Sequence, residues 1–376
     1  QIRFSFFIPP CIISFILLEK RDKMNVQKGT ASLTRINLID VIRGIAIIGI
    51  LLINIHFFEP SDTKSIEINT FDSKVINYIE MFSLNKFHFI FAFLFGVSTS
   101  IFINNLQKKG LTIWVHIRRM VLLFMVGATS SLLWDGDILK LYAVMGLLLL
   151  LFQKIRNTIK LICGVFLIIL GNFLPVLTKF LEIKGIHIPN LLNSFVLLMV
   201  MLSTLGHMLL GQALYYIGIF TNKSLLPKLK KYWVLFLTLT LLIWVLALFI
   251  QSNELLHSFN QNSGPIIGIF YILTILLLYQ ITPVQKCLSI LIPYGKMAFT
   301  NYLGQTIIGV VILTPILSNY TVHTYGMLLL YVAIVAFQVV FSFIWMHYFL
   351  FGPLEWLWRC GTYLKIQPIR KSNNFL

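Results

Sequence analysis

Ten apolar runs, separated by short polar segments, dominate the chain from residue 41 onward. A helix needs about 20 residues to cross the roughly 30 Å of hydrocarbon in a bilayer, because each residue adds about 1.5 Å. The pattern therefore predicts an all-α, polytopic membrane bundle of about ten transmembrane helices. The runs lie at about 41–58, 87–104, 118–134, 138–153, 160–178, 193–220, 232–251, 264–282, 297–317 and 326–351.

The run at 193–220 is longer than one crossing requires. It contains Gly206, His207, Gly211 and Gln212, and the extra length together with the glycines predicts a tilted or broken helix. No soluble domain, low-complexity tract or repeat interrupts the runs. Residues 24–376 are therefore expected to form a single transmembrane domain.

Composition supports the membrane assignment. Of 376 residues, 58% are hydrophobic and 11% are charged, with a mean hydropathy of +0.86. Soluble domains carry about 25% charged residues, so an ordinary soluble globular protein is excluded. The four cysteines show neither C-x-x-C spacing nor histidine neighbours, and we expect no structural metal and no disulfide framework.

The distribution of Lys and Arg predicts the orientation. With the amino terminus in the cytoplasm, seventeen basic residues of the loops fall inside, and the positive-inside rule favours that arrangement. Ten crossings then leave both termini cytoplasmic. The net charge of +17 fits cytoplasmic loops and lipid headgroups better than nucleic acid. Six basic residues fall outside: Lys64, Lys74, Lys86, Lys140, Lys179 and Lys184.

The first 23 residues are expected to be a leader that is not part of the natural protein. The chain begins with Gln1, and its first methionine is Met24. The apolar stretch at 4–18 is shorter than a spanning helix, contains Pro9 and Pro10, and has its basic residues after it instead of before it. A secretory signal has the opposite order.

Ionisable groups in hydrocarbon are costly and default to functional hypotheses, so we sorted the polar residues by expected depth. The groups fall on two faces. The outer group comprises Asn54, His56, His88, Asp135 and Asp137. The inner group comprises Asp40, Arg43, Arg118, Arg119, Lys296, Asn301, Glu355 and Arg359.

Several of these residues also have structural interpretations. Asp40 and Arg43 have the spacing of a local ion pair, as do Glu355 and Arg359, which flank two tryptophans suited to the headgroup region. Asp137 follows Gly136 and precedes an apolar run, which is typical of a helix N-cap. His56 and His88 can simply lie at the membrane interface. Asn301 and Gln305 can form interhelical hydrogen bonds. His207 and His347 can be interior residues with satisfied hydrogen bonds.

Several fragments together resemble the YeiB-like family of bacterial membrane proteins, known as domain of unknown function 418. Residues 35–54 resemble the family's first helix, with the pattern D-x-x-R-G-x-A-x-x-G-I-L-x-x-N. A departure is Thr129-Ser130, where relatives commonly carry a histidine before the G-D-I-L turn. The other matching segments are 91–96 (F-A-F-L-F-G), 118–119 (R-R), 136–143 (G-D-I-L-K-L-Y-A), 295–305 (G-K-M-A-F-T-N-Y-L-G-Q) and 352–359 (G-P-L-E-W-L-W-R).

The first-helix pattern is also distantly similar to transmembrane acyltransferases, among them bacterial sugar O-acyltransferases and the lysosomal enzyme that acetylates heparan glucosamine. This similarity divides the chain into an acyltransferase-like part at about 35–180 and a family-specific part at about 193–365. Bacterial O-acyltransferases carry an essential histidine eleven positions after the arginine, whereas here Asn54 follows Arg43 at that offset, as in the lysosomal branch.

The resemblance implies a multi-pass protein of the bacterial plasma membrane that moves an acyl group from cytoplasmic acyl-CoA, its possible co-substrate, to a glycan or lipid of the cell envelope. His56 is then the first candidate for the general base, followed by His88 and Asp137. Asp40, Glu355 and Arg359 would support the site. The candidate substrate-binding residues are Arg43, Asn54, Arg118, Arg119, Asn301 and Gln305, of which the arginines would receive the CoA phosphates.

Two other functions explain the same polar residues. In a transporter or exporter they would line a permeation path, and in a membrane scaffold they could be changed singly without loss of a ligand response. Acyl chain, acceptor and oligomeric state are not encoded in any motif of the chain.

Overall fold

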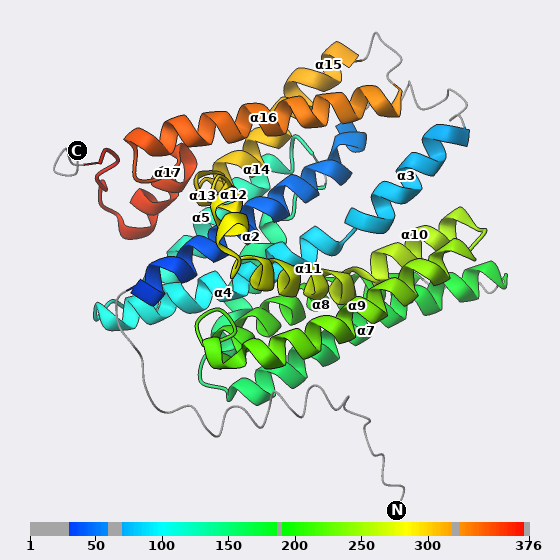
Figure 1. The fold of residues 1–376 in the computed structure, drawn as a ribbon, viewed down its shortest axis with the longest axis horizontal. Coiled ribbons are helices and arrows are strands. Elements are labelled where there is room, and N and C mark those ends of the chain that lie inside the picture. Colours follow the sequence, from blue (N-terminus) through cyan, green and yellow to red (C-terminus); the bar gives the residue numbers. More distant parts are fainter. Residues whose placement is uncertain (1–29, 59–69, 135, 186–189, 318–322, 372–376) are drawn as a thin grey trace, which may run out of the picture.

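The computed structural model describes residues 30–58, 70–134, 136–185, 190–317 and 323–371. The expected leader at 1–23 and Asp135 lie outside these ranges. The described residues form a bundle of helices (Figure 1), as the apolar runs predict. Its first half contains α2 (Thr30–Asn54), η1 (Ile55–Phe58), α3 (Thr70–Ser83), α4 (Lys86–Lys108), α5 (Trp114–Ser130), α6 (Leu139–Leu148), η3 (Leu149–Phe152) and α7 (Asn157–Ile183).

The second half of the bundle includes several short helices besides the long ones. It contains α8 (Asn190–Ile217), η4 (Lys223–Leu225), α9 (Leu226–Leu248), α10 (Asn253–Asn262), α11 (Gly264–Leu278), α12 (Thr282–Leu288), α13 (Leu291–Lys296), α14 (Ala298–Thr306), the π-helical η5 (Ile307–Leu313), α15 (Thr314–Leu317), α16 (Thr324–Tyr348) and α17 (Pro353–Tyr363).

Each of the ten apolar runs coincides with one of these helices or with a consecutive group of them. Within the described residues, seven helical segments are long and apolar enough to cross a membrane, or eight if α10 and α11, which meet at a bend of 49°, form one span. The helix α5 has 17 residues, and α6 with η3 is shorter still. The polytopic helical bundle is therefore confirmed, while ten crossings remain a prediction.

For the run at 193–220, where a tilted or a broken helix was expected, the break is wrong, because α8 continues without interruption to Ile217. The tilt stays a prediction. The glycines of α8 serve helix packing instead. A Cβ built on Gly206 would lie 2.7 Å from the carbonyl oxygen of Gly164 in α7, and one on Gly211 would lie 2.0 Å from that of Phe93 in α4. Small residues let membrane helices approach this closely. The glycines of α8 therefore hold it against α4 and α7.

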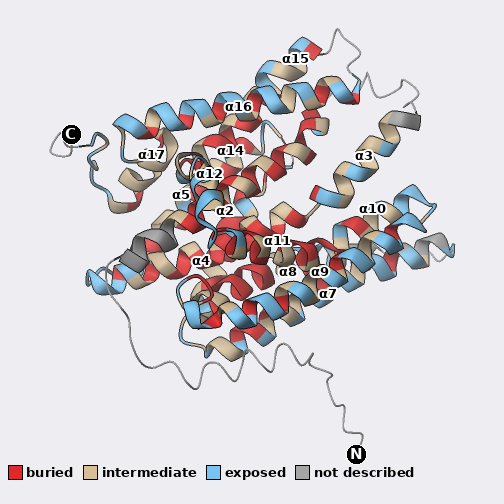
Figure 2. Ribbon diagram, in the orientation of Figure 1, coloured by how far each residue is buried: buried red, intermediate tan, exposed pale blue. Residues whose placement is uncertain are grey.

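The buried core surrounds α2 and α4, with α8 and α11 beside them (Figure 2). In the span that contains α2, 78% of the most apolar window is buried, against 17% in the span that contains α9 and 22% in α16. The outer helices expose their apolar side chains, as lipid-facing helices do. The polar groups of α2 and α4 consequently lie inside the protein.

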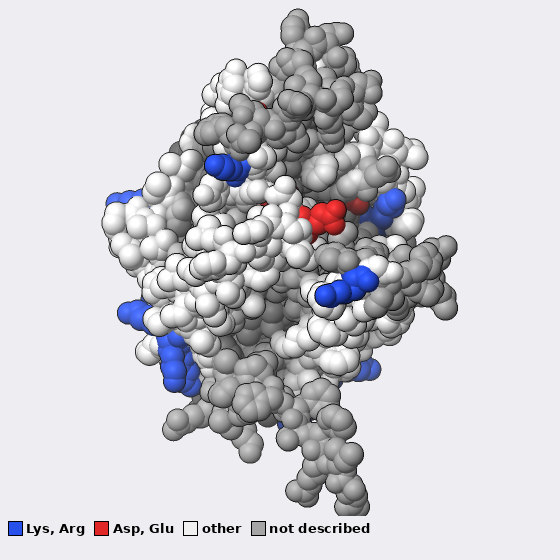
Figure 3. Space-filling view, turned by 90° about the vertical axis from the view of Figure 1, so that its right-hand side faces the viewer, with Lys and Arg blue, Asp and Glu red and all other residues white. Residues whose placement is uncertain are grey.

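The start of α2 and the carboxy-terminal segment with α17 lie at the same end of the bundle, on the left in Figure 1. We call this the α17 end. The opposite end contains α3, α10 and the last turns of α7, and Figure 3 shows only a few scattered Lys and Arg side chains there, with a small acidic patch. This arrangement fits the orientation predicted from charge, in which the α17 end faces the cytoplasm.

Candidate functional site

The inner residues predicted from the sequence meet at the α17 end. Arg43 of α2 donates from Nη1 to Asp40 Oδ1 at 2.7 Å and to the carbonyl oxygen of Gly295 at 3.4 Å, and from Nη2 to Ser98 Oγ of α4 at 3.0 Å. The ion-pair interpretation of Asp40 and Arg43 is therefore confirmed. Because its guanidinium joins α2, α4 and α13, Arg43 acts mainly to position these helices.

A close backbone contact brings α13 to this point. A Cβ on Gly295 would lie 1.8 Å from the carbonyl oxygen of Asp40, so only glycine permits the observed approach of α13 to α2. The next residue, Lys296, is exposed, and its charge acts on the Asp40 carboxylate. The G-K pair of the 295–305 motif is thus placed beside the D-x-x-R pair of α2.

Arg119 of α5 is held between two aromatic rings. Its guanidinium carbon lies 4.3 Å from the ring centroid of Phe102 on α4 and 4.5 Å from that of Trp358 on α17. Trp358 Nε1 also donates to the carbonyl oxygen of Arg119 at 2.9 Å. Stacking fixes the plane of a guanidinium and leaves its N–H edge available for an anion.

The spacing of Glu355 and Arg359 suggested a pair within α17, but the structure gives each of them other partners. Glu355 Oε1 accepts the backbone N–H groups of Phe299 and Thr300 at 2.7 and 3.0 Å, and Oε2 accepts the Thr300 hydroxyl. The first turn of α14 has N–H groups without helical partners, and a carboxylate satisfies them well. Burial raises the pKa of Glu355.

Arg359 stacks on aromatic rings of its own surroundings, with its guanidinium carbon 4.7 Å from the centroid of Phe351 and 5.3 Å from that of Tyr363. The charges of Arg43 and Arg359 both act on Arg119. We call the set Arg43, Arg119, Lys296 and Arg359 the inner cationic cluster.

The inner cationic cluster has surplus positive charge. Among the described residues, the one ion pair at this end joins Arg43 to Asp40, and no acidic side chain pairs with Arg119 or Arg359. The Nε atoms of Arg359 and of the neighbouring Arg118 are buried without a hydrogen-bond partner among those residues. Buried donors without partners are costly, so the arrangement suits a polyanionic ligand.

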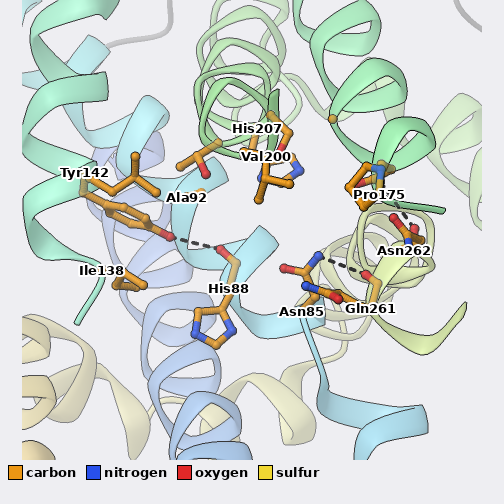
Figure 4. A pocket seen from close by; sticks show the side chains of 15 residues that line it. Asn85, His88, Ala92, Ile138, Tyr142, Pro175, Val200, His207, Gln261 and Asn262 are labelled. Carbon is orange, nitrogen blue, oxygen red and sulfur yellow. Dashed lines mark hydrogen bonds between the residues drawn. The ribbon is translucent and has the colours of Figure 1, made fainter. Parts of the chain in front are cut away.

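On the opposite face, a cavity of about 180 Å³ lies between α4, α6, α7, α8 and α10 (Figure 4). His88 and His207 both line it. The Tyr142 hydroxyl donates to the carbonyl oxygen of His88 at 3.2 Å, and Asn85 Nδ2 donates to that of Gln261 at 2.9 Å. Imidazoles beside amide groups can bind a polar acceptor and take a proton from it.

His207 and His347 were expected to be satisfied interior groups, and the structure differs for both. His347 is exposed on α16, and His207 lies at the cavity without a partner for one ring nitrogen. The side chain of His207 is buried in a T-shaped contact with Phe89, at 4.9 Å between centroids, and its Nε2 has no hydrogen-bond partner among the described residues. A lone imidazole on an apolar helix gave no signal of this position, because hydropathy does not show which helix faces a cavity.

Asp137 accepts a hydrogen bond at the start of the helix that follows it. Its Oδ1 accepts the backbone N–H of Leu139, the first residue of α6, at 2.7 Å, but the N-cap residue of α6 is Ile138 and not Asp137 as expected. Its Oδ2 is buried without a hydrogen-bond partner in the described structure, and burial raises the pKa of the carboxyl. The adjacent Ile138 lines the cavity, which places Asp137 at its margin.

His56 lies in η1 and does not line this cavity. Its Nε2 is buried and has no partner in the described part of the chain, and the charge of Glu80 acts on the ring. Asn54, the last residue of α2, is also buried. Of the three catalytic candidates, His88 is the one that belongs to the lining of this cavity.

The sequence reasoning missed a second outer group, formed by Glu80, Lys86 and His257. Lys86 is fully buried, and its ammonium donates to the carbonyl oxygens of Asn260 at 2.7 Å and Glu80 at 3.2 Å. The Glu80 carboxylate pairs with His257 Nδ1 at 3.0 Å. Lys86 thus satisfies a carbonyl near the end of α10, where the bend to α11 begins.

Asn301 and Gln305 belong to a hydrogen-bonded network between α13, α14 and α16. Asn301 Nδ2 donates to the Tyr294 carbonyl oxygen and to Ser342 Oγ, both at 3.0 Å, and Gln305 Nε2 donates to the Tyr294 hydroxyl at 3.1 Å and to Gln338 Oε1 at 3.2 Å. Gln338 returns a bond to the Asn301 carbonyl. These contacts support the interhelical interpretation of both residues.

Comparison with known proteins agrees with the motifs. The chain is 30% identical to the uncharacterized protein YxaH of Bacillus subtilis (strain 168), over 93% of this chain and 99% of that protein. It belongs to the DUF418 family. The family description, "Protein of unknown function (DUF418)", matches residues 214–365.

Two further relatives of this DUF418 protein also align over most of its length. An uncharacterized 39.9 kDa protein in the amylase 3′ region of Bacillus acidopullulyticus is 31% identical over 89% of the chain and 96% of its own length. The uncharacterized protein YeiB of Escherichia coli (strain K12) is 25% identical over 85% and 94%. No solved structure matches the chain.

The inner cationic cluster draws on both parts of this DUF418 chain. Lys296 and Arg359 come from the matched region 214–365, whereas Arg43 and Arg119 come from helices that precede it. The division at about 180–193 remains a prediction.

Among the described residues, no group of three or more His, Cys, Asp or Glu side chains is arranged to hold a metal ion.

Proposed function

We propose that this DUF418 protein is a membrane acyltransferase, which moves an acyl group from cytoplasmic acyl-CoA to a hydroxyl or amine of a cell-envelope glycan or lipid. The observation that carries the proposal is the inner cationic cluster, with Arg119 stacked between two rings and no acidic partner in the described structure. CoA is a polyphosphate, and guanidinium groups bind phosphate through two parallel N–H bonds. Bacterial relatives fit a plasma-membrane location.

Arg119 and Arg359 are the phosphate-binding residues in this proposal. Their planes are set by Phe102, Trp358 and Tyr363, and Arg359 retains a buried Nε donor without a partner in the described structure. Arg43 has a different role, because Asp40, Ser98 and Gly295 already occupy its donors. It positions α4 and α13 around the ligand.

The reaction would take place toward the opposite face, at the cavity that His88 lines. The acceptor oxygen or nitrogen attacks the thioester carbonyl carbon while the His88 imidazole takes its proton. The carbon–sulfur bond then breaks, and the CoA thiolate leaves and takes up a proton. A neutral imidazole is the usual acceptor for such a proton near pH 7.

The helix α4 connects the two places. Ser98, which bonds Arg43, follows His88 by ten residues, and ten residues of α-helix span about 15 Å. Phe91 and Phe95 lie on α4 between them and pack against Tyr142, with centroids at 5.8 and 5.5 Å. In this proposal the extended arm of CoA passes these aromatic rings to bring its thioester to the cavity.

Thermal unfolding of the detergent-purified protein with CoA, acetyl-CoA and longer acyl-CoAs tests the inner part of the proposal, because a ligand that binds the folded state raises apparent stability. We expect a saturable rise in wild type, a weaker one in Arg119→Gln, and an unchanged one in the control Arg156→Gln, which removes an exposed arginine. No rise for any thioester in the folded protein would refute the proposal.

Transfer of labelled acyl groups to the lipid and glycan fractions of membranes tests the catalytic part. His88→Ala should abolish transfer while keeping the CoA-dependent stabilisation, and His347→Ala, which changes an exposed histidine of α16, should leave both unchanged. Transfer by His56→Ala is measured in parallel, because full transfer by this variant together with none by His88→Ala assigns the general base to His88. Full transfer by His88→Ala would exclude His88 as the base.

A transporter is the second candidate, favoured by the bend of 49° between α10 and α11. Broken helices often surround substrate sites in transporters, and here the buried ammonium of Lys86 lies next to the break. Such a protein would show substrate-dependent flux in proteoliposomes without incorporating acyl groups.

A further inference from the structure

A second and larger pocket lies at the α17 end, away from the inner cationic cluster. Its volume is about 630 Å³, within the roughly 300–1,000 Å³ typical of sites for small ligands. The last turns of α4, the turn between η3 and α7, the start of α7 and the end of α8 surround it. Its polar lining includes Asn104, Gln107, Gln153, Lys154, Asn157, Lys160 and Tyr216.

The pocket carries positive charge that no acid neutralises. Its lining includes Lys154 and Lys160 but no Asp or Glu, and neither lysine forms an ion pair within the described residues. Lys160 is 2% exposed. Its ammonium lies 5.1 Å from the ring centroid of Tyr216 and 3.5 Å from the carbonyl oxygen of Gln153. A buried ammonium with such weak partners retains donors for an anion.

Two further features add donors to the same space. The Tyr216 hydroxyl donates to Asn104 Oδ1 at 3.0 Å, which leaves the NH₂ group of that amide as a donor. Asn157 begins α7, a helix of 27 residues whose amino-terminal end carries partial positive charge. Lysine, amide and helix end are together suited to a phosphate group.

The rest of the lining is apolar, and part of it faces outward. Leu111 and Ile113 are 40% and 42% exposed, and Leu151 is 72% exposed. Trp114, next to this rim, is 66% exposed, as expected of tryptophan at a membrane interface. Because the span of α7 starts at Asn157, the pocket lies where hydrocarbon meets headgroups.

We propose that this pocket binds an anionic phospholipid, with the headgroup phosphate at Lys154 and Lys160 and the acyl chains over Leu111, Ile113 and Leu151. A free phosphate would need no apolar rim, and a zwitterionic lipid would leave the two lysines without compensation. Basic pockets between helices on the cytoplasmic side are typical sites for anionic headgroups. The assignment does not depend on acyl transfer.

The test uses the full-length protein in mixed micelles that contain phosphatidylglycerol or phosphatidylcholine. Native mass spectrometry measures retained lipid, and thermal unfolding measures the affinity. We expect phosphatidylglycerol to bind preferentially, and Lys154→Gln and Lys160→Gln each to weaken it about fivefold, since one lysine near a headgroup contributes about 1 kcal/mol. The control Lys230→Gln, which removes an exposed lysine at the start of α9, should bind as wild type does.

Three results would overturn the assignment. These are equal retention of the two lipids, an equal loss in Lys230→Gln, and displacement of the lipid by millimolar glycerol phosphate or CoA, which would make the ligand a soluble phosphate compound. Because Lys154 is exposed at the rim, Lys154→Gln decides the outcome even if replacing the buried Lys160 prevents folding. If CoA does not stabilise the wild-type protein but phosphatidylglycerol still binds preferentially, the result contradicts only the proposed enzyme function.

Discussion

The contact between Glu355 and the start of α14 gives the sharpest prediction about stability. Glu355→Ala removes the acceptor of two backbone N–H groups and one hydroxyl. Loss of an ordinary N-cap costs about 0.5–2 kcal/mol, and hydrogen bonds to charged groups contribute about 1.5–3 kcal/mol each. Since these bonds share one carboxylate and are not additive, we expect a loss of about 2–4 kcal/mol in the free energy of unfolding.

A series of substitutions at Glu355 and Thr300 separates the contributions of the individual hydrogen bonds. Glu355→Gln keeps an oxygen for the N–H groups of Phe299 and Thr300, and should lose about 1 kcal/mol through the weaker acceptor. Thr300→Val removes only the hydroxyl, which also accepts the backbone N–H of Leu354 at 3.1 Å. If the carboxylate and the hydroxyl act as one cap, the double variant Glu355→Ala/Thr300→Val should lose less than the sum of the single variants.

Equilibrium unfolding in mixed micelles with increasing sodium dodecyl sulfate provides the measurement. Tryptophan fluorescence reports on the region directly, because Trp358 and Trp356 lie on α17 beside the cap. A Glu355→Ala protein within about 0.5 kcal/mol of wild type, the range of ordinary surface substitutions, would refute the capping argument. So would strict additivity in the double variant.

Three more predictions follow from packing, hydrogen bonding and charge. Gly211→Ala places a methyl group 2.0 Å from the Phe93 carbonyl oxygen and should cost about 1–3 kcal/mol by the same unfolding assay. Gln338→Leu leaves buried partners in α13 and α14 without their amide and should cost about 1–3 kcal/mol, checked by loss of thermal stability. Because burial raises the pKa of Glu355 in the folded protein, protonation of this carboxyl favours the folded state. The free energy of unfolding should therefore decrease as the pH rises from the ordinary carboxyl pKa through the raised value and then level off, and Glu355→Gln should remove this slope from a stability–pH curve.

The sequence predicted the long helices well, since continuous apolar runs leave few alternatives in a membrane. It did not predict α3 or α10, because their polar composition resembles that of loops: α10 reads N-E-L-L-H-S-F-N-Q-N. The glycines of α8 were interpreted as a break because glycine is both a helix breaker and a packing residue. Only the neighbouring helices distinguish these two uses.

For the candidate site, sorting residues by depth placed Arg43, Arg119 and Arg359 on one face, and the structure brings them together. Depth alone could not show that Arg119 stacks on Trp358, or that Glu355 prefers the start of α14 to its neighbour Arg359. Local spacing predicts contacts within one helix, whereas these partners come from helices far apart in the chain. The position of His207 at the outer cavity was unpredictable for the same reason.

The close contact between α4 and α8 limits how this protein can move. Cβ atoms on Gly96 and Gly211 would each lie 2.0 Å from a carbonyl oxygen of the other helix, Met208 and Phe93 respectively. Two helices whose backbones touch at consecutive places cannot slide or rock against each other without first separating. If the bundle opens toward either side of the membrane, we therefore expect other helices to move while α4 and α8 stay together. The bend between α10 and α11 is one place where such a movement can occur.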